Sequence, residues 1–315
     1  MADTHTQSES INWADLGEDD PSLNPGSTSP VQHDKGSETI KSFKSDKPGQ
    51  VIGCTGVKGG LGTTTVALNL AMSLVQTGHR VIFLELSPHP GTVTAYLDQT
   101  PNSSVRLAEL TPSDINAEIL AKLTIVHSSG LEFIYGSLWS QSHRLSSDLL
   151  ESLFQRLTTR TEYVIVDFPL ESSPITECIL QHCHLVNVIA DTDRVCLETA
   201  QQQLSFLKKE GYPHIFLTVV NRTGMPPADG LKGIQDQLGC QALALIPSAT
   251  ELCFTAVTKN LPIVCNNPNS LPAIQFFQMR DHILAYLTGE ADSLQQDRRA
   301  KDRRKQNRRE GRDGW

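Results

Sequence analysis

The chain lacks any long apolar run and any recognisable export signal. No stretch of about eighteen consecutive apolar residues occurs, so the sequence predicts no transmembrane helix. Met1 is followed by polar and acidic residues rather than by the basic and apolar regions of a signal peptide. We therefore expect a cytoplasmic protein, with a peripheral position at the inner face of the membrane or at a cell pole as an alternative.

A disulfide framework is also missing. The seven cysteines are odd in number and irregularly spaced, which argues against paired cysteines. Cys178, Cys183 and His184, with His182 between them, are the densest group of potential metal ligands. Their spacing fits no zinc template, and the segment is more typical of a helix that runs into a buried strand. A metal cluster remains the alternative interpretation of this group.

Charge is distributed unevenly along the chain, whose formal net charge is -8. Residues 1–48 are rich in Ser, Asp, Glu, Gly and Pro and have almost no regularly spaced apolar positions, which predicts a disordered acidic segment. Residues 291–315 are dense in arginine and predict a basic tail, either disordered or a solvated helix. Residues 49–290 are long enough and apolar enough to form one folded domain.

The most informative stretch is the glycine-rich loop from Val57 to Thr65. A strand-like run at 51–54 precedes it and a helix-like run at 66–75 follows, which is the context that a phosphate-binding loop requires. Its glycines let backbone N–H groups converge on phosphate oxygens at the start of the helix, whereas a turn without function is the alternative. The predicted nucleotide-binding residues of the loop are Gly59, Gly60, Leu61, Gly62, Thr63, Thr64 and Thr65.

The loop lacks the lysine that usually carries most of its positive charge. In the pattern GxxxxGK[ST], this lysine precedes the last residue, and here Thr63 stands in its place while Val57 replaces the first glycine. Thr64 keeps the hydroxyl that can bind Mg²⁺. Lys58, directly before the double glycine, is the lysine that the loop retains.

Short apolar runs alternate with helical patterns after the loop. The predicted strands are 80–86, 131–135, 163–167, 185–190, 215–221 and 242–246, and the predicted helices are roughly 148–157, 175–181, 194–210, 231–238 and 271–287. This alternation predicts an α/β fold, a three-layer doubly wound and mostly parallel sheet. Ligands of such sheets bind beyond the carboxyl ends of the strands, so the residues that follow each strand are candidates for the site.

The stretch Lys58 to Thr64 resembles the deviant Walker loop KGGxGK[ST] of the MinD/ParA family. The resemblance implies a P-loop NTPase fold that binds ATP or ADP with Mg²⁺. It also implies a homodimer in which a catalytic lysine, here Lys58, reaches the nucleotide of the other subunit. Threonine in place of the second lysine is most similar to the CpaE/TadZ branch, which positions pilus assembly machinery.

The resemblance extends to the ends of several strands. Asp167 matches the Walker B aspartate that holds Mg²⁺ through a water, so we assign it to catalysis and, with Thr64, to the metal. Asn221 and Arg222 match the VVNR strand end, where the asparagine pairs with adenine, and Pro247 lies where relatives pass a loop over the base. Ordinary turns are the alternative for such polar strand ends.

Two further segments match motifs of the same family. Residues 191–194 match a polar turn that faces the family's dimer interface, and a helix cap by Thr192 or Asp193 is the alternative. Residues 85–91 align with the DxDxxxG switch, where Glu85 replaces the first aspartate and Ser87 the second. Serine is a poor base at neutral pH, so we expect nucleotide binding with weak or absent hydrolysis, and enzymatic activity stays open.

The leading functional hypothesis is a nucleotide-dependent dimer that positions pilus or secretion machinery. The alternative is an active ParA-type ATPase that partitions DNA or other cargo. The basic tail suits weak contact with DNA or anionic membrane, or no contact at all, and it lacks the apolar face of a membrane anchor. A bacterial tyrosine kinase is disfavoured because the tail contains no tyrosine cluster.

Overall fold

The computed structural model describes residues 48–87, 91–100, 104–137, 145–212, 214–225 and 230–289. The predicted basic tail and all but the last residue of the predicted acidic segment lie outside these residues, as do residues 88–90 of the predicted switch. None of the helices in the described ranges is both long enough and apolar enough to cross a membrane.

Within the described residues, eight strands form one sheet in the order β3-β4-β2-β5-β1-β6-β7-β8. They are β1 (Gln50–Gly56), β2 (Val81–Ser87), β3 (Ile125–Val126), β4 (Glu132–Ser137), β5 (Tyr163–Asp167), β6 (Leu185–Asp191), β7 (Ile215–Val220) and β8 (Ala242–Ile246). Neighbouring strands are parallel except for β3 and β4. The prediction of an α/β, mostly parallel sheet is therefore confirmed.

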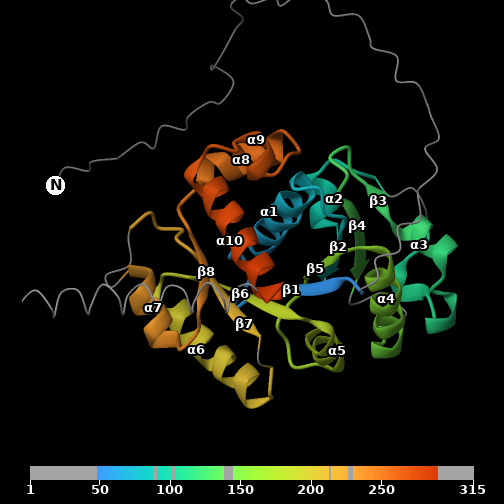
Figure 1. The fold of residues 1–315 in the computed structure, drawn as a ribbon, viewed down its shortest axis with the longest axis horizontal. Helices are drawn as coiled ribbons and strands as arrows, with labels where there is room; N and C mark the ends of the chain where they lie inside the picture. Colours follow the sequence, from blue (N-terminus) through green and yellow to red (C-terminus); the bar gives the residue numbers. More distant parts are fainter. Residues whose placement is uncertain are drawn as a thin grey trace, which may run out of the picture. The chain divides into compact units, whose positions relative to one another are not determined.

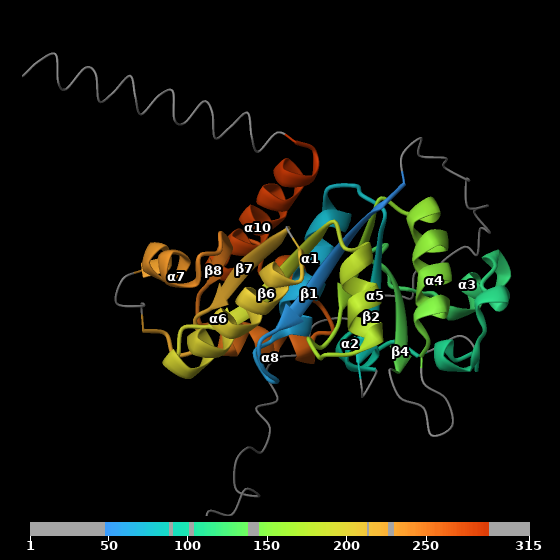
Figure 2. The same cartoon turned by 90° about the horizontal axis from the view of Figure 1, so that it is seen from below.

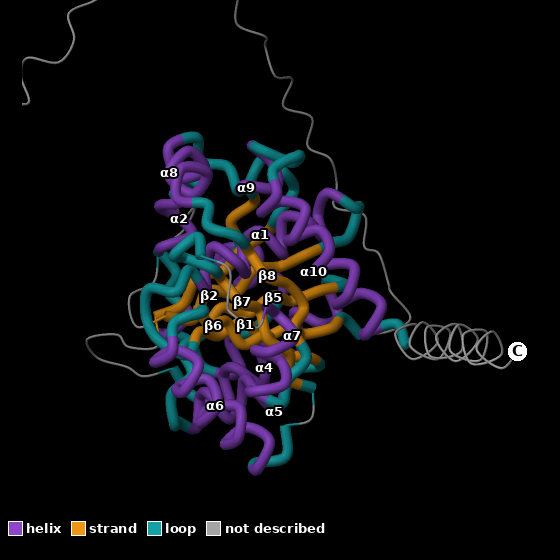
Figure 3. The backbone as a smooth tube through the Cα atoms, turned by 90° about the vertical axis from the view of Figure 1, so that its left-hand side faces the viewer, coloured by secondary structure: helices purple, strands orange, loops and turns teal. Residues whose placement is uncertain are grey.

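Helices cover both faces of the sheet (Figures 1 and 3). One face carries α1 (Thr63–Gln76), α8 (Thr250–Thr258), α9 (Ile263–Asn266) and α10 (Leu271–Leu287), and the other carries α4 (Ser147–Arg160), α5 (Pro174–His182), α6 (Arg194–Lys209) and α7 (Gly230–Leu238). Covered on both sides, the central strands are apolar almost throughout, and β6 is buried along its whole length.

The sequence patterns did not reveal several short elements. These are α2 (Thr92–Tyr96), α3 (Ala117–Leu123), the 3₁₀ helices η2 (Leu107–Glu109) and η3 (Pro112–Asp114), the antiparallel strand β3, and helices α8 and α9. β3 and η2 pack against β4, and η3 packs against α4. Figure 2 shows α3 next to α4 from below. Most of these elements carry too few residues for a periodic apolar pattern to emerge. α8 has nine residues, but of these only Ala256 is buried, so its apolar residues do not mark one buried face.

Polar side chains start most of the longer helices. Ser146, Ser173, Asp193 and Ser270 each accept a hydrogen bond from a backbone N–H in the first turn of α4, α5, α6 and α10. The predicted cap by Asp193 is thereby confirmed. Helix α1 begins differently, because Gly62 precedes it in the left-handed region with φ 85° and provides no side-chain cap.

Candidate functional site

The loop between β1 and α1 is shaped by its glycines. Gly60 and Gly62 have φ values of 76° and 85°, which side chains rarely tolerate. A Cβ atom on Gly56 would lie 2.3 Å from Thr63 Oγ1, so this position also requires glycine. With no side chain capping α1 and no acidic residue in its first turn, the amides and the positive end of the helix dipole are available to an anion.

The phosphate side of the site is a cavity of about 680 Å³ beside this loop. It is lined by Gly59, Gly60, Gly62, Thr63, Thr64, Thr65, Ser87 and Asp167, among others. Thr64 Oγ1 donates a hydrogen bond of 2.6 Å to Asp167 Oδ2. The parallel pairing of β1 with β5 places Asp167 beside Cys54 and therefore close to the start of the loop.

Asp167 has a strongly altered acidity. Its pKa is raised to about 7, chiefly by burial and in smaller part by the charge of Glu85, whereas the hydrogen bond from Thr64 lowers it. A hydroxyl and a carboxylate are the hard oxygen ligands that suit Mg²⁺, and a cation beside Asp167 would favour its ionised form. The residues present thus fit the predicted metal, which would neutralise phosphate charge at this position.

Glu85 has a structural role in the described residues. Its carboxylate is buried and accepts hydrogen bonds from the backbone nitrogens of Gly91, Thr92 and Val93 at 3.2, 3.0 and 3.4 Å. These contacts hold the start of α2 beneath the phosphate cavity. The Glu85 carboxylate, at the first switch position, is therefore hydrogen-bonded to the backbone. Ser87, at the second switch position, lines the cavity.

Lys58 forms an ion pair within its own chain. Its Nζ lies 2.8 Å from Asp193 Oδ2, and both side chains remain nearly 40% exposed, at 39% and 38%. The hydrogen bond to Asp193 raises the pKa of Lys58, and the same contact lowers the pKa of Asp193. Asp193 also accepts a hydrogen bond of 2.8 Å from Cys196 N at the start of α6. One carboxylate thus caps a helix and holds the lysine of the loop.

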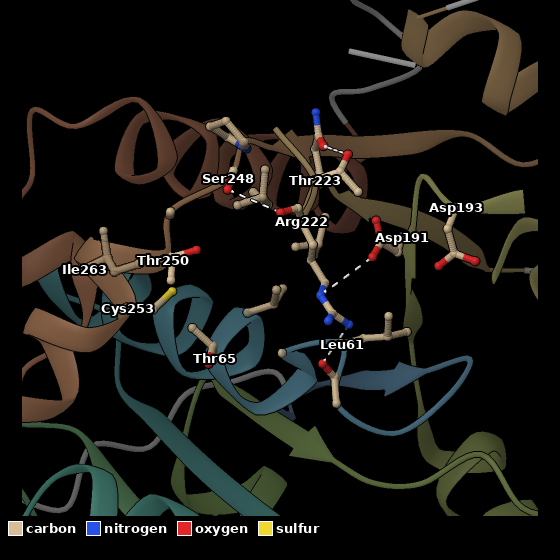
Figure 4. A pocket seen from close by; sticks show the side chains of 18 of the residues that line it. Leu61, Thr65, Asp191, Asp193, Arg222, Thr223, Ser248, Thr250, Cys253 and Ile263 are labelled. Carbon is tan, nitrogen blue, oxygen red and sulfur yellow. Dashed lines mark hydrogen bonds and ion pairs between the residues drawn. The ribbon is translucent and has the colours of Figure 1, made fainter. Parts of the chain in front are cut away.

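A second cavity of about 610 Å³ lies on the other side of the loop, toward β7 and β8 (Figure 4). Its lining includes Leu61, Pro247, Ile263 and Phe276, together with the predicted residues Asn221 and Arg222. Apolar walls with a few polar groups suit the faces and edge of a nucleobase. The two cavities share Lys58, Gly60, Gly62 and Thr65, so the predicted loop, metal and base residues all border one continuous region.

Arg222 and Asn221 are both engaged inside this second cavity. Arg222 Nη1 donates to the carbonyl of Gly60 at 3.2 Å, and Arg222 Nε lies 3.7 Å from Asp191 Oδ2 (Figure 4). Asn221 Nδ2 donates to the carbonyl of Met225 at 2.8 Å, while its Oδ1 accepts from Gly224 N at 3.1 Å. In this arrangement, the side-chain amide of Asn221 stabilises the turn formed by residues 221–225.

The alternative of a cysteine and histidine metal cluster finds no support in the part of the chain that is described. No group of three or more potential ligands gathers there. His182 Nδ1 bonds to the carbonyl of Cys178 at 2.9 Å, and His184 Nδ1 accepts from Val51 N at 3.1 Å. These histidines stabilise the helix end and the adjacent strand.

Sequence reasoning did not identify Gly56 as a site residue or Asp193 as the partner of Lys58. The requirement at Gly56 arises from the close approach of the Thr63 side chain, which depends on how the loop folds back. Asp193 was recognisable as a helix cap, but its ion pair joins positions 135 residues apart. Only the fold brings these residues together.

Comparison with known sequences places this site in a family. Residues 49–211, just over half of the chain, match the family described as an AAA domain. The antiactivator FleN of Pseudomonas aeruginosa is 39% identical over 66 residues, which are 21% of this chain and 24% of FleN. The cellulose biosynthesis protein BcsQ of Escherichia coli is 28% identical over 164 residues, 49% of this chain and 63% of BcsQ. The chain thus matches less than two thirds of either relative.

Solved structures share the fold at low identity. A ParA family ATPase from Chlorobium tepidum has a TM-score of 0.66 at 18% identity, over 75% of this chain and 99% of that one. MinD of Pyrococcus horikoshii with Mg-ADP has a TM-score of 0.61 at 19% identity, over 74% and 95%. A putative plasmid partition protein of Borrelia burgdorferi bound to AMPPNP has a TM-score of 0.57 at 17% identity, over 76% and 100%.

Proposed function

The chain belongs to the AAA-domain family that matches residues 49–211, and on this premise we propose that it binds an adenine nucleotide with Mg²⁺ at the loop 57–65. The observation that carries the proposal is the contact of 2.6 Å between Thr64 Oγ1 and Asp167 Oδ2 beside the uncapped start of α1. This contact places two oxygen atoms that can bind Mg²⁺ beside the backbone N–H groups that can bind phosphate. Proteins of the same fold solved with Mg-ADP and AMPPNP support this ligand class.

We further propose that nucleotide favours a homodimer. Lys58 would leave Asp193 and contact the phosphates bound by the partner molecule. Both side chains of the ion pair are exposed to solvent, so its loss costs little. A polyphosphate carries a denser negative charge than one carboxylate and so competes well for the ammonium group. Nucleotide can drive this change only to the extent that it prefers the dimer.

Hydrolysis should be weak or absent. Thr63 replaces the lysine that would stabilise the transferring phosphoryl group, and Ser87 replaces the aspartate of the switch. Loss of one preorganised charge stabiliser typically costs about 3 kcal/mol, roughly a hundredfold in rate. The carboxylate of Glu85 does not compensate, because three backbone N–H groups occupy it. Binding without rapid turnover suits a protein that stays dimeric for as long as its nucleotide is bound.

The dimer would then position a protein machine. The two curated relatives are named for antiactivation and for cellulose biosynthesis, and neither name concerns pili. Pilus or secretion machinery of the CpaE/TadZ type therefore stays one candidate cargo. An active ParA-type ATPase that partitions DNA is the second candidate function, and the similarity to a ParA family ATPase and to a plasmid partition protein favours it.

Molecular mass in solution, measured together with phosphate release, tests this proposal. We expect the mass to double with Mg-ATP while phosphate release stays near background, and we expect Lys58→Ala to remain monomeric. Rapid turnover above that of Lys58→Ala would instead support the ATPase candidate. The double variant Thr63→Lys with Ser87→Asp should gain hydrolysis. An unchanged rate would show that residues 85–91 are not the switch.

A further inference from the structure

A third cavity, of about 540 Å³, lies between α5 and α6, on the face of the sheet opposite α1 and α10 (Figures 1 and 3). Its apolar lining includes Leu180, Tyr212 and Phe206, whose ring is 50% exposed. Among the described residues, its charged lining consists of Glu171, Glu177 and Glu210, and no lysine, arginine or histidine borders it. We call this cavity the acidic cleft.

Within the described ranges, no ion pair neutralises the carboxylates of the acidic cleft. None of Glu171, Glu177 and Glu210 takes part in an ion pair there. Burial raises the pKa of the Tyr212 hydroxyl, and the negative charges of Glu177 and Glu210 raise it further. Like charges gathered around apolar walls create a negative potential that attracts a cation.

Aromatic rings beside carboxylates suit arginine in particular. A guanidinium group can stack on the exposed face of Phe206 or Tyr212 and donate two parallel hydrogen bonds to a glutamate. The aliphatic stem of an arginine can at the same time cover apolar surface such as Leu180. Metal ions or lysine would leave the aromatic walls largely unused, so the lining favours an arginine-rich peptide.

The described part of the chain ends close to one side of this cleft. In the last turn of α10, the Tyr286 ring packs edge-on against Phe216 with ring centroids 4.7 Å apart, and its hydroxyl contacts His214 Nδ1. His214 is only two residues from Tyr212, which lines the acidic cleft. The chain therefore leaves α10 at Gly289 near the end of the cleft that Tyr212 and Glu210 form.

We propose that the acidic cleft binds the arginine-rich segment of the same chain, residues 298–312. This segment contains Arg298, Arg299, Lys301, Arg303, Arg304, Lys305, Arg308, Arg309 and Arg312. Eight residues separate Gly289 from Arg298, and the distance that they can span is up to about 30 Å when extended. A link of this length gives a local concentration on the order of millimolar, so modest pairwise attractions suffice for docking.

Carbodiimide coupling of the full chain tests this contact directly, because it joins amines to carboxylates that touch. The segment offers two amines, Lys301 and Lys305. At low protein concentration, we expect peptide mapping to find them joined to Glu171, Glu177 or Glu210 of the same chain, with loss of the coupling at about 0.5 M salt. Coupling spread over all exposed carboxylates, concentrated in residues 1–47, or formed between two chains would overturn the proposal.

A labelled peptide of residues 291–315 provides an independent measurement. It should bind at least tenfold more weakly to the full chain carrying Glu177→Gln and Glu210→Gln than to a matched control carrying Glu109→Gln and Glu251→Gln, which are exposed carboxylates away from the cleft. A full chain with its own tail neutralised by Arg303→Gln, Arg304→Gln, Arg308→Gln and Arg309→Gln should bind the peptide more tightly than the native chain. Equal affinities in both comparisons would contradict the proposal.

Discussion

The two halves of the proposed nucleotide site differ in how much of each is already built. On the phosphate side, the glycine loop, the free start of α1 and the Thr64–Asp167 pair surround a cavity of about 680 Å³. On the base side, Arg222 bonds to Gly60 and Asp191 across the cavity, and the amide of Asn221 holds a turn. The phosphate half can accept its ligand as it stands. In the base half, Arg222 and Asn221 must break these contacts before they can bind a base.

The difference follows from what builds each half. Backbone amides and the helix dipole form the phosphate half, and their directions are set by β1, α1 and a few glycine positions. Apolar walls with a few polar side chains form the base half, and these polar groups bond to one another, because an unpaired buried polar group such as Asn221 is costly. Phosphate and metal should therefore supply most of the affinity, and the base should mainly supply specificity.

The largest expected effect tests the phosphate half. Asp167→Asn retains an oxygen that can accept from Thr64 but removes the charge that would hold the metal. We expect it to lower the affinity for ADP in the presence of Mg²⁺ by about 10- to 100-fold, and to change little in EDTA. Calorimetric titration with and without Mg²⁺ measures both values. Equal losses in the two conditions would show that Asp167 supports the loop and not a cation.

The raised pKa of Asp167 predicts that Mg²⁺-dependent nucleotide binding in the phosphate half varies with pH. Its pKa is raised to about 7, so the metal must displace a proton at lower pH. Mg²⁺-dependent affinity should fall by up to about tenfold from pH 8 to pH 6. Because the folded pKa exceeds the unfolded value of 3.8, the protonated group stabilises the metal-free protein, and that contribution should be lost as pH rises from about 4 to about 7. Asp167→Asn should abolish both trends, and a pH-independent native protein would contradict the assignment.

The same division explains what the sequence could predict. The strand-loop-helix order, the glycines, Thr64 and Asp167 were recognisable because local pattern and strand ends determine them. The turn at Asn221 was the alternative that local pattern offered, and its partners Gly224 and Met225 are near in sequence. The partners of Lys58 and Arg222 were not recognisable, because they depend on residues brought close only by the sheet order. Short elements such as β3 and α9 escaped for another reason, since they contain too few residues to show a period.

Base specificity provides the next test. Asn221→Asp keeps the oxygen that accepts from Gly224 N but removes the N–H group that an adenine edge would need. If Asn221 leaves its turn to bind the base, the preference for ADP over GDP should fall about tenfold, the worth of one hydrogen bond. Thr223→Ala is the control, because it perturbs the same turn without changing the amide. An unchanged ratio of ADP to GDP affinities would leave Asn221 a residue of the turn alone.

The smallest expected effect concerns Lys58, which lies between the two halves. Asp193→Asn keeps an oxygen to cap α6 and removes the charge that holds Lys58. Because exposed ion pairs contribute little, freeing the lysine should lower the protein concentration needed for the Mg-ATP dimer by no more than about fivefold. Arg194→Gln, which breaks an exposed pair with Glu198 on the same helix, is the matched control. Weaker dimerisation of Asp193→Asn would mean that the Lys58–Asp193 pair is itself part of the dimer and that Lys58 acts within its own chain.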